Sequence, residues 1–75
     1  MTLEKIIAKV LGVNEALITD TAGPDSIESW DSFNALLLIA EMEKHFNTTF
    51  TIDEVAGVKT VADIKKILKE RGISF

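Results

Sequence analysis

One hydroxyl group in the sequence occupies a position where an attached phosphate would be stabilised. Ser32 follows Trp30 and Asp31, where a stretch rich in turn-forming residues gives way to an apolar helical pattern. The first turn of a helix has free backbone N–H groups and the positive end of the helix dipole, both of which favour a phosphate ester. The only histidine, His45, lies several turns further along, and no G-x-S-x-G elbow is present. Ser32 is therefore predicted to be an attachment point, and no residue is expected to be catalytic.

The chain before Ser32 is predicted to form one helix and a long ordered loop. Apolar residues recur at helical spacing between Thr2, a suitable N-cap, and Gly12, a suitable terminator. Residues 12–30 contain a cluster of breakers at 23–26 and are predicted to form the loop. The apolar residues expected to anchor this loop on the helices are Val13, Leu17, Ile18, Ile27 and Trp30.

The second helix is predicted from about Ser32 to about Phe46, with Asp31 as its cap. Its sequence has two apolar faces. One face consists of Ala35, Leu38, Ile39, Met42 and Phe46, and the nearly opposite face consists of Phe33, Leu36, Leu37 and Ala40. The second face is either core beneath the long loop or a surface for a partner, with Leu37 as the member expected to be most exposed.

The remaining chain is predicted to contain a turn, a short helix and a last helix. Residues 47–49 form the turn, and Phe50 and Ile52 anchor the segment after it. A short helical turn is expected around residues 53–56. The last helix starts after Thr60, which with Asp63 resembles a capping box, and ends at Gly72. The basic residues near its end are expected to complement the helix dipole; they are Lys65, Lys66, Lys69 and Arg71.

Together these segments predict an all-α fold, a four-helix bundle of three main helices and one short helix, with a long loop after the first. The 75 residues suit a single domain spanning positions 1–75. The composition, 47% hydrophobic and 27% charged, is that of a globular chain. With no cysteine, disulfides and thiolate metal sites are excluded, and no metal site is expected.

Charge and hydropathy exclude several classes of function. The net charge is −4, whereas a nucleic-acid-binding protein would normally carry a basic stripe. The apolar run at residues 36–40 is far too short to span a bilayer, and the first eleven residues do not resemble a signal peptide. A cytoplasmic monomer that binds no nucleic acid is expected.

Around Ser32 the sequence resembles the acyl carrier protein family. That family has Asp-Ser and a hydrophobic residue at the head of its second helix, here Asp31-Ser32-Phe33. The resemblance continues through residues 36–46 (LLLIAEMEKHF), 50–54 (FTIDE) and 60–64 (TVADI), and so covers almost the whole chain. The Asp-Ser pair alone is a weak signal, but the pair together with this helix, this spacing and this total length is fairly specific.

The resemblance implies a carrier that is not itself an enzyme. A phosphopantetheinyl transferase would use coenzyme A and Mg²⁺ to attach 4'-phosphopantetheine to Ser32, and Asp31 would belong to the motif that this transferase recognises. The arm would hold an acyl group as a thioester, sheltered between the helices. The partners would be acyl-ligase, acyltransferase or synthase enzymes that contact the second helix. The residues expected at that contact are Phe33, Leu36, Leu37, Ala40, Glu41 and Glu43.

A second pair, Asp25-Ser26, competes with Asp31-Ser32 for the attachment site. For Ser26 to head the helix, the helix would have to begin directly after Gly23-Pro24, which is possible because proline is tolerated at helix starts. The distance from Ser26 to Phe46 would then be six residues too long for the family pattern, which favours Ser32. The simpler alternative is that Ser32 is only a helix-start serine.

The second helix also departs from the pattern of fatty-acid-synthesis carriers. Asn34 and Leu37 stand where those carriers usually have acidic residues, and Lys44 interrupts the later acidic run. Recognition by partners is therefore expected to be less electrostatic and more apolar. This favours a specialised lipid, polysaccharide or secondary-metabolite pathway. The alternatives are a peptidyl or aminoacyl carrier protein and a helical interaction module without a prosthetic group.

Overall fold

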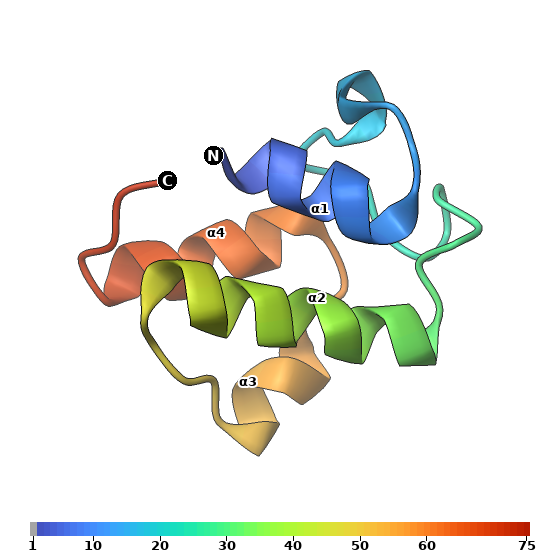
Figure 1. The fold of residues 1–75 in the computed structure, drawn as a ribbon. Coiled ribbons are helices and arrows are strands. Elements are labelled where there is room, and N and C mark those ends of the chain that lie inside the picture. The colour runs from blue at the N-terminus through green and yellow to red at the C-terminus, as the bar shows by residue number, and fades with distance from the viewer. Residues whose placement is uncertain (1) are drawn as a thin grey trace.

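The computed structural model describes residues 2–75, and within this range the chain is helical with no strands. The elements are α1 (Leu3–Leu11), a 3₁₀ turn η1 (Glu15–Leu17), α2 (Ser32–Phe46), α3 (Ile52–Gly57) and α4 (Val61–Glu70). Figure 1 shows α1 lying across one side of α2 and α4, while the short α3 lies on the other side. The predicted bundle with a long first loop is confirmed.

Capping residues explain where the main helices begin and end. The Thr2 hydroxyl accepts a hydrogen bond from the Lys5 N–H at 3.3 Å, and Gly12 ends α1 in the left-handed conformation with φ 67°. Asn47 ends α2 with φ 51°, a conformation that asparagine tolerates better than most residues. These ends follow from the sequence because capping depends on residues a few positions apart.

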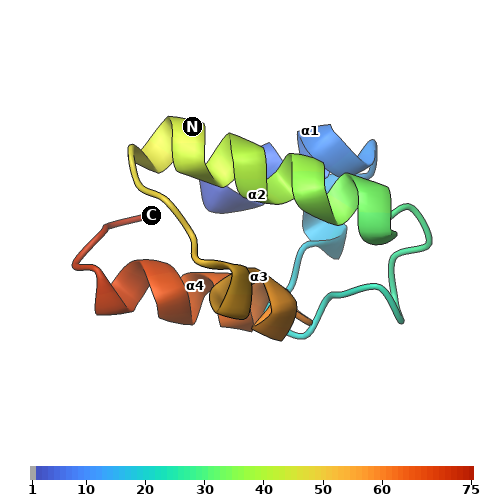
Figure 2. The same cartoon turned by 90° about the horizontal axis from the view of Figure 1, so that it is seen from below.

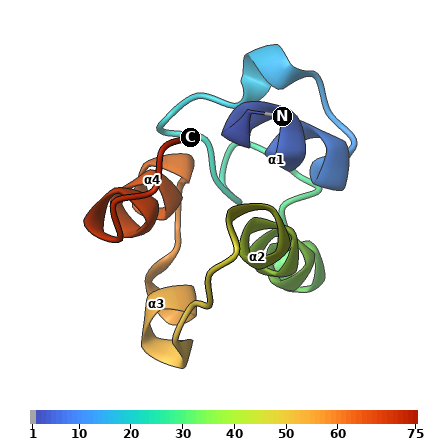
Figure 3. The same ribbon diagram turned by 60° about the vertical axis from the view of Figure 1, so that its left-hand side comes forward.

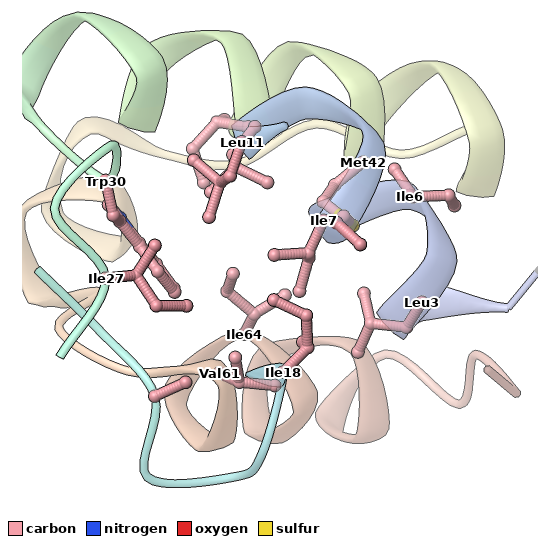
Figure 4. Packing of buried hydrophobic residues seen from close by; sticks show 14 of the residues in the cluster. Leu3, Ile6, Ile7, Leu11, Ile18, Ile27, Trp30, Met42, Val61 and Ile64 are labelled. Carbon is pink, nitrogen blue, oxygen red and sulfur yellow. The ribbon is translucent and has the colours of Figure 1, made fainter. Parts of the chain in front are cut away.

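The long loop supplies part of the hydrophobic core. Figure 4 shows Ile18, Ile27 and Trp30 of the loop pointing into the space bounded by side chains of α1, α2 and α4. These three anchors are confirmed, with Trp30 only 2% exposed. Leu17 was expected to be an anchor as well, but it lies at the end of η1 and is 56% exposed. The 3₁₀ turn, which the sequence analysis missed, leaves Leu17 outside while the next residue, Ile18, enters the core.

Backbone hydrogen bonds join the loop to the start of α4. The N–H groups of Val61 and Ala62 belong to the first turn of α4 and have no partner within that helix. They donate to the carbonyl oxygens of Ala22 and Asp20, each at 2.9 Å. The loop therefore caps α4 as well as covering the core.

Lys65 reinforces the junction between the loop, α1 and α4. Its ammonium group lies 2.5 Å from the carboxylate of Asp20 and 3.1 Å from that of Glu4. The hydrogen bond to Asp20 raises the pKa of Lys65, with a second contribution from Glu4. The expectation that Lys65 complements the end of its own helix was wrong, because this side chain reaches across to α1 and the loop instead.

The short helix α3 is held mainly by contacts at its ends, together with Val55, which is partly buried against the core. Phe50, just before it, is buried as predicted, but Ile52 is 87% exposed, so its predicted anchoring was wrong. No residue of α3 itself is buried. Thr51 and Glu54 form a capping box that turns the chain into the helix, which leaves Ile52 on the outer side of the first turn.

Arg71 holds α3 from the end of α4. Its guanidinium makes two hydrogen bonds to the Glu54 carboxylate, at 2.8 and 2.5 Å, and a third to the carbonyl oxygen of Thr49 at 2.9 Å. It also lies 5.4 Å from the centroid of the Phe50 ring. Arg71 was expected to complement the end of its own helix; it is the C-cap residue of α4, and its side chain also bonds to the neighbouring segment.

Candidate functional site

Ser32 is the first residue of α2 and lies at the rim of the molecule. Figure 2 shows the start of α2 projecting at the edge of the bundle, where the long loop enters it. Ser32 is exposed, and its hydroxyl group makes no hydrogen bond with any other residue in the range 2–75. The backbone N–H groups of Ser32 and Phe33 have no partner in that range either. A hydroxyl that can react and N–H groups that can bind a phosphate oxygen therefore occupy the same helix end.

Asp31 caps α2 beside this hydroxyl, as predicted. One of its carboxylate oxygens accepts a hydrogen bond from the Asn34 N–H at 2.8 Å. The other oxygen makes no hydrogen bond within residues 2–75. The Asp31 side chain is exposed, so part of its carboxylate stays accessible to a protein that binds this helix end.

Two residues that the sequence analysis did not select fix the chain on either side of Asp31. The Asn34 side-chain amide donates to the Ser29 carbonyl oxygen at 2.8 Å. The Ser29 hydroxyl in turn donates to the carbonyl oxygen of Leu11, at the end of α1, at 2.7 Å. The start of α2 is thereby linked to the end of α1. The available signal was the spacing, because a polar residue three positions after an N-cap stands out in an apolar helix.

The competing serine, Ser26, is engaged within the loop. Its hydroxyl accepts a hydrogen bond from the Gly23 N–H at 3.1 Å and lies 3.3 Å from the Gly23 carbonyl oxygen, to which it donates. The segment around it is a turn, and α2 begins only at Ser32. The helix that would have to start directly after Pro24 is not formed.

The second apolar face of α2 is open to solvent. Phe33 is 70% exposed, Leu36 61% and Leu37 42%, and Ala40 is exposed as well. The alternative that this face is core beneath the long loop is therefore wrong. Leu37 was expected to be the most exposed member, but it is the least exposed of the three large residues because it lines a groove against α1.

The two acidic residues expected to meet partners both have contacts inside the molecule. Glu41 lies 3.5 Å from His45, one turn further along α2. Glu43 accepts a hydrogen bond from the Phe50 N–H at 2.8 Å and so fixes the connection between α2 and α3. The exposed surface of α2 is therefore mainly apolar near Ser32, and its acidic groups are partly occupied.

Behind Trp30, a small apolar cavity lies between α2, α3 and α4. Its volume is about 20 Å³. The residues that line it are Trp30, Ala35, Leu38, Ile39, Val55, Val58 and Ile64. Figure 3 shows α2, α3 and α4 arranged around this region, with α1 on the far side of α2. A cavity of this size holds about one water molecule, so a longer guest would require the helices to separate.

The comparisons with known proteins agree with this geometry. The family model described as "phosphopantetheine attachment site" matches residues 2–68. Because the match covers most of the chain, the protein belongs to this family of acyl-carrier-type domains. A covalently attached 4'-phosphopantetheine is the prosthetic group that this family carries, and an exposed serine hydroxyl at a helix start is a chemically suitable acceptor for it.

The fold is also that of a solved carrier structure. A protein from Mycobacterium tuberculosis, assigned as an acyl carrier protein, superposes with a TM-score of 0.79. The alignment covers 93% of this chain and 99% of that one, at 22% sequence identity. At this identity the similarity establishes the shared fold. Within residues 2–75, no helix is both long and apolar enough to cross a membrane.

Proposed function

We propose that this protein is an acyl carrier whose 4'-phosphopantetheine arm is attached to the hydroxyl of Ser32. The observation that supports this most strongly is an exposed hydroxyl at the head of α2 without a partner in the range 2–75, in a chain that belongs to the phosphopantetheine attachment family. When attached, the arm supplies a terminal thiol that holds an acyl group as a thioester. The protein contributes no catalytic residue and acts on substrates only through partner enzymes.

Ser32 is a better acceptor than Ser26 for two physical reasons. The Ser26 hydroxyl already makes hydrogen bonds to the Gly23 backbone, and these would be lost on modification. Ser26 also lacks the helix start that stabilises a phosphate beside Ser32. Asp31, next to the acceptor and only half engaged in capping, is the residue that we propose the phosphopantetheinyl transferase recognises, with coenzyme A and Mg²⁺ as its other requirements.

The exposed face of α2 is the proposed contact for enzymes that load or use the arm. Phe33 and Leu36 lie directly after Ser32 and are mostly exposed, so a partner that encloses the arm would bury them. Leu37 and Ala40 extend this face, with Glu41 and Glu43 at its edge. A contact dominated by apolar side chains supports a dedicated acyl-ligase, acyltransferase or synthase in a specialised lipid, polysaccharide or secondary-metabolite pathway.

In this proposal the acyl group is sheltered between α2, α3 and α4. The cavity there is lined by apolar residues, but its volume of about 20 Å³ is too small for an extended chain. Because α3 buries none of its own residues, moving it costs less packing energy than moving α1, α2 or α4. The acyl group that the cavity shelters is therefore either short, or it is accommodated by an outward movement of α3. The protein is further proposed to work as a monomer in the cytoplasm, where coenzyme A is the donor of the arm.

A peptidyl or aminoacyl carrier is the second candidate function. The residual acids on α2 favoured an acyl carrier in the sequence analysis, but Glu41 and Glu43 both have intramolecular partners, which weakens that preference. Incubating the loaded protein with acyl-activating and amino-acid-activating ligases, and weighing the products, separates the two. A module without a prosthetic group is disfavoured by membership of the attachment family.

The test of the proposal is intact-mass analysis after incubation with coenzyme A, Mg²⁺ and a broad-specificity phosphopantetheinyl transferase. Wild type and Ser26→Ala are expected to gain one phosphopantetheine, and Ser32→Ala is expected to gain none. Ser26→Ala is the matched control because it also removes one serine hydroxyl, that of the competing Asp-Ser pair. An equal gain in all three proteins would place the arm on another residue, and no gain in any of them would refute the carrier assignment.

A further inference from the structure

A groove between α1 and α2 adjoins the proposed contact face of α2, with which it shares Leu37, Ala40 and Glu41. It has a volume of about 550 Å³ and is lined entirely by residues of these two helices. Figure 3 shows α1 and α2 side by side, with α3 and α4 elsewhere in the bundle. The lining residues are Ile6, Lys9, Val10, Leu37, Ala40, Glu41, Lys44 and His45.

The floor of the groove is apolar and partly accessible. Ile6 is buried and Val10 is half-buried, while Leu37 is 42% exposed and Ala40 is exposed. A side chain of moderate size that entered the groove would therefore bury apolar surface on both helices. α1 also contributes five buried residues to the core, so the wall that it provides is firmly fixed.

The rim of the groove is positively charged, although the protein as a whole has a net charge of −4. Lys9 lies on one side and Lys44 on the other, and neither forms an ion pair with any residue in the range 2–75. Among residues 2–75, Glu41 is the single acid that lines the groove, and its carboxylate lies 3.5 Å from the His45 ring. The two lysines are thus the free charges that a ligand meets first.

We infer that this groove binds a segment of a partner protein that presents an apolar side chain between carboxylate groups. The apolar side chain would lie on the floor, and the carboxylates would reach Lys9 and Lys44. A basic segment would bring like charges together at the rim. An anionic bilayer fits less well, because its flat surface cannot place a side chain in a groove between two helices.

The position of the groove suits a partner that also handles the arm. Leu37 lies five residues after Ser32, which corresponds to about 8 Å along the helix axis. A protein that is seated in the groove and also covers the neighbouring turn of α2 would therefore reach the attachment site proposed above. Only this relation to the arm rests on the proposed function, because binding to the groove itself requires no prosthetic group.

The inference is tested by titrating isotopically labelled protein with three synthetic helical peptides and recording amide NMR spectra. The peptides, each about 14 residues long, share one leucine face and carry flanking glutamates, lysines or glutamines. The glutamate peptide is expected to shift the amide signals of residues 6–10 and 37–45 and to bind most tightly. Each exposed ion pair contributes about threefold to affinity, so the glutamate peptide should bind about tenfold more tightly than the glutamine peptide.

Charge reversal supplies the matched control. The double variant K9E/K44E is expected to bind the glutamate peptide about tenfold or more less tightly than wild type does. The variant K66E/K69E changes the net charge by the same amount on α4, outside the groove, and should bind the peptide nearly as wild type does. All four lysines are exposed, and a wild-type-like amide NMR spectrum of each free variant confirms that it remains folded.

Three results would overturn the inference. The first is equal weakening of glutamate-peptide binding by both double variants. The second is binding of the lysine peptide as tight as that of the glutamate peptide, and the third is that no peptide binds to the groove. Binding to vesicles of anionic lipid that K9E/K44E abolishes, without binding of the glutamate peptide, would replace the protein partner with a membrane surface. If wild type is loaded normally in any of these cases, the carrier function stands while the groove proposal fails.

Discussion

At the scale of single residues, the proposed attachment site depends on a few hydrogen bonds around a hydroxyl that has no partner within residues 2–75. The start of α2 at Ser32 and its cap Asp31 could be predicted because both follow from short-range helix-start chemistry. The contributions of Ser29 and Asn34 could not be predicted. Ser29 donates to the Leu11 carbonyl oxygen and Asn34 to the Ser29 carbonyl oxygen, and the positions of both acceptors depend on the path of the loop. The sequence indicates which hydroxyl is available but not what holds the chain on either side of it.

Replacing Asn34 with alanine is expected to destabilise the protein by about 1 kcal/mol, because a side-chain hydrogen bond to the Ser29 carbonyl oxygen is lost. Ser29→Ala should cost a similar amount by removing the bond to Leu11. The two bonds hold the same segment, so the double variant should cost less than the sum of the singles. Chemical unfolding of the three variants measures this. Strict additivity would show that the two bonds act independently.

At the scale of the elements, the main helices were predictable and the short ones only in part. The three long helices have local caps and apolar stripes, and their bounds follow from these features. Leu17 and Ile52 were assigned to the core because they are apolar, yet each lies on the outer side of a short turn. Burial within a turn of this length is decided by the direction in which the flanking chain leaves it, which no local pattern specifies.

The Arg71–Glu54 contact makes the position of α3 sensitive to acid. Hydrogen bonds from Arg71, followed by the Thr51 N–H, lower the pKa of Glu54 from 4.5 to about 2. A carboxylate with a lowered pKa in the folded state stabilises the protein fully above its unfolded pKa. This contribution is lost as the pH falls through the folded value, here between about 4.5 and about 2.

The destabilisation caused by Arg71→Ala is therefore expected to be largest near neutral pH and to shrink as the pH is lowered from about 4.5 towards 2. Thermal unfolding of wild type and variant across this range measures the difference. In the variant, the NMR titration of the Glu54 carboxyl group should move up towards its ordinary pKa. Arg71→Lys is the control, because it keeps the charge and loses the two-pronged geometry. A difference in stability that does not change with pH would contradict this role of the contact.

At the scale of the whole molecule, the long loop after α1 packs against the start of α4 and completes the core between these two helices. Gly23 allows this close approach, because a Cβ atom at that position would lie 2.2 Å from the carbonyl oxygen of Lys59. The cluster of breakers in the sequence indicated a turn, but not that the loop passes against the connection between α3 and α4. Contacts between segments so far apart in sequence leave no signal in local spacing.

Gly23→Ala is expected to destabilise the protein by about 1–3 kcal/mol, because the backbone of residue 59 must move to admit the methyl group. Gly57→Ala is a matched control, since a Cβ atom there meets nothing within 4 Å and the residue lies in α3. Alanine at position 57 should be neutral or stabilising by up to about 1 kcal/mol. Denaturant unfolding compares the stabilities of the two variants. Equal changes in the free energy of unfolding would show that the loop can move at Gly23 with little cost.

The central claim is that the prosthetic arm is carried by the hydroxyl group at the start of α2. The most direct measurement is fragmentation mass spectrometry of peptides from wild-type protein after loading, which identifies the residue that bears the added mass. The arm is predicted on the fragment ions that contain Ser32 and on none that contain only Ser26 or Ser29. Its appearance on either of those serines, with Ser32 unmodified, would contradict the account.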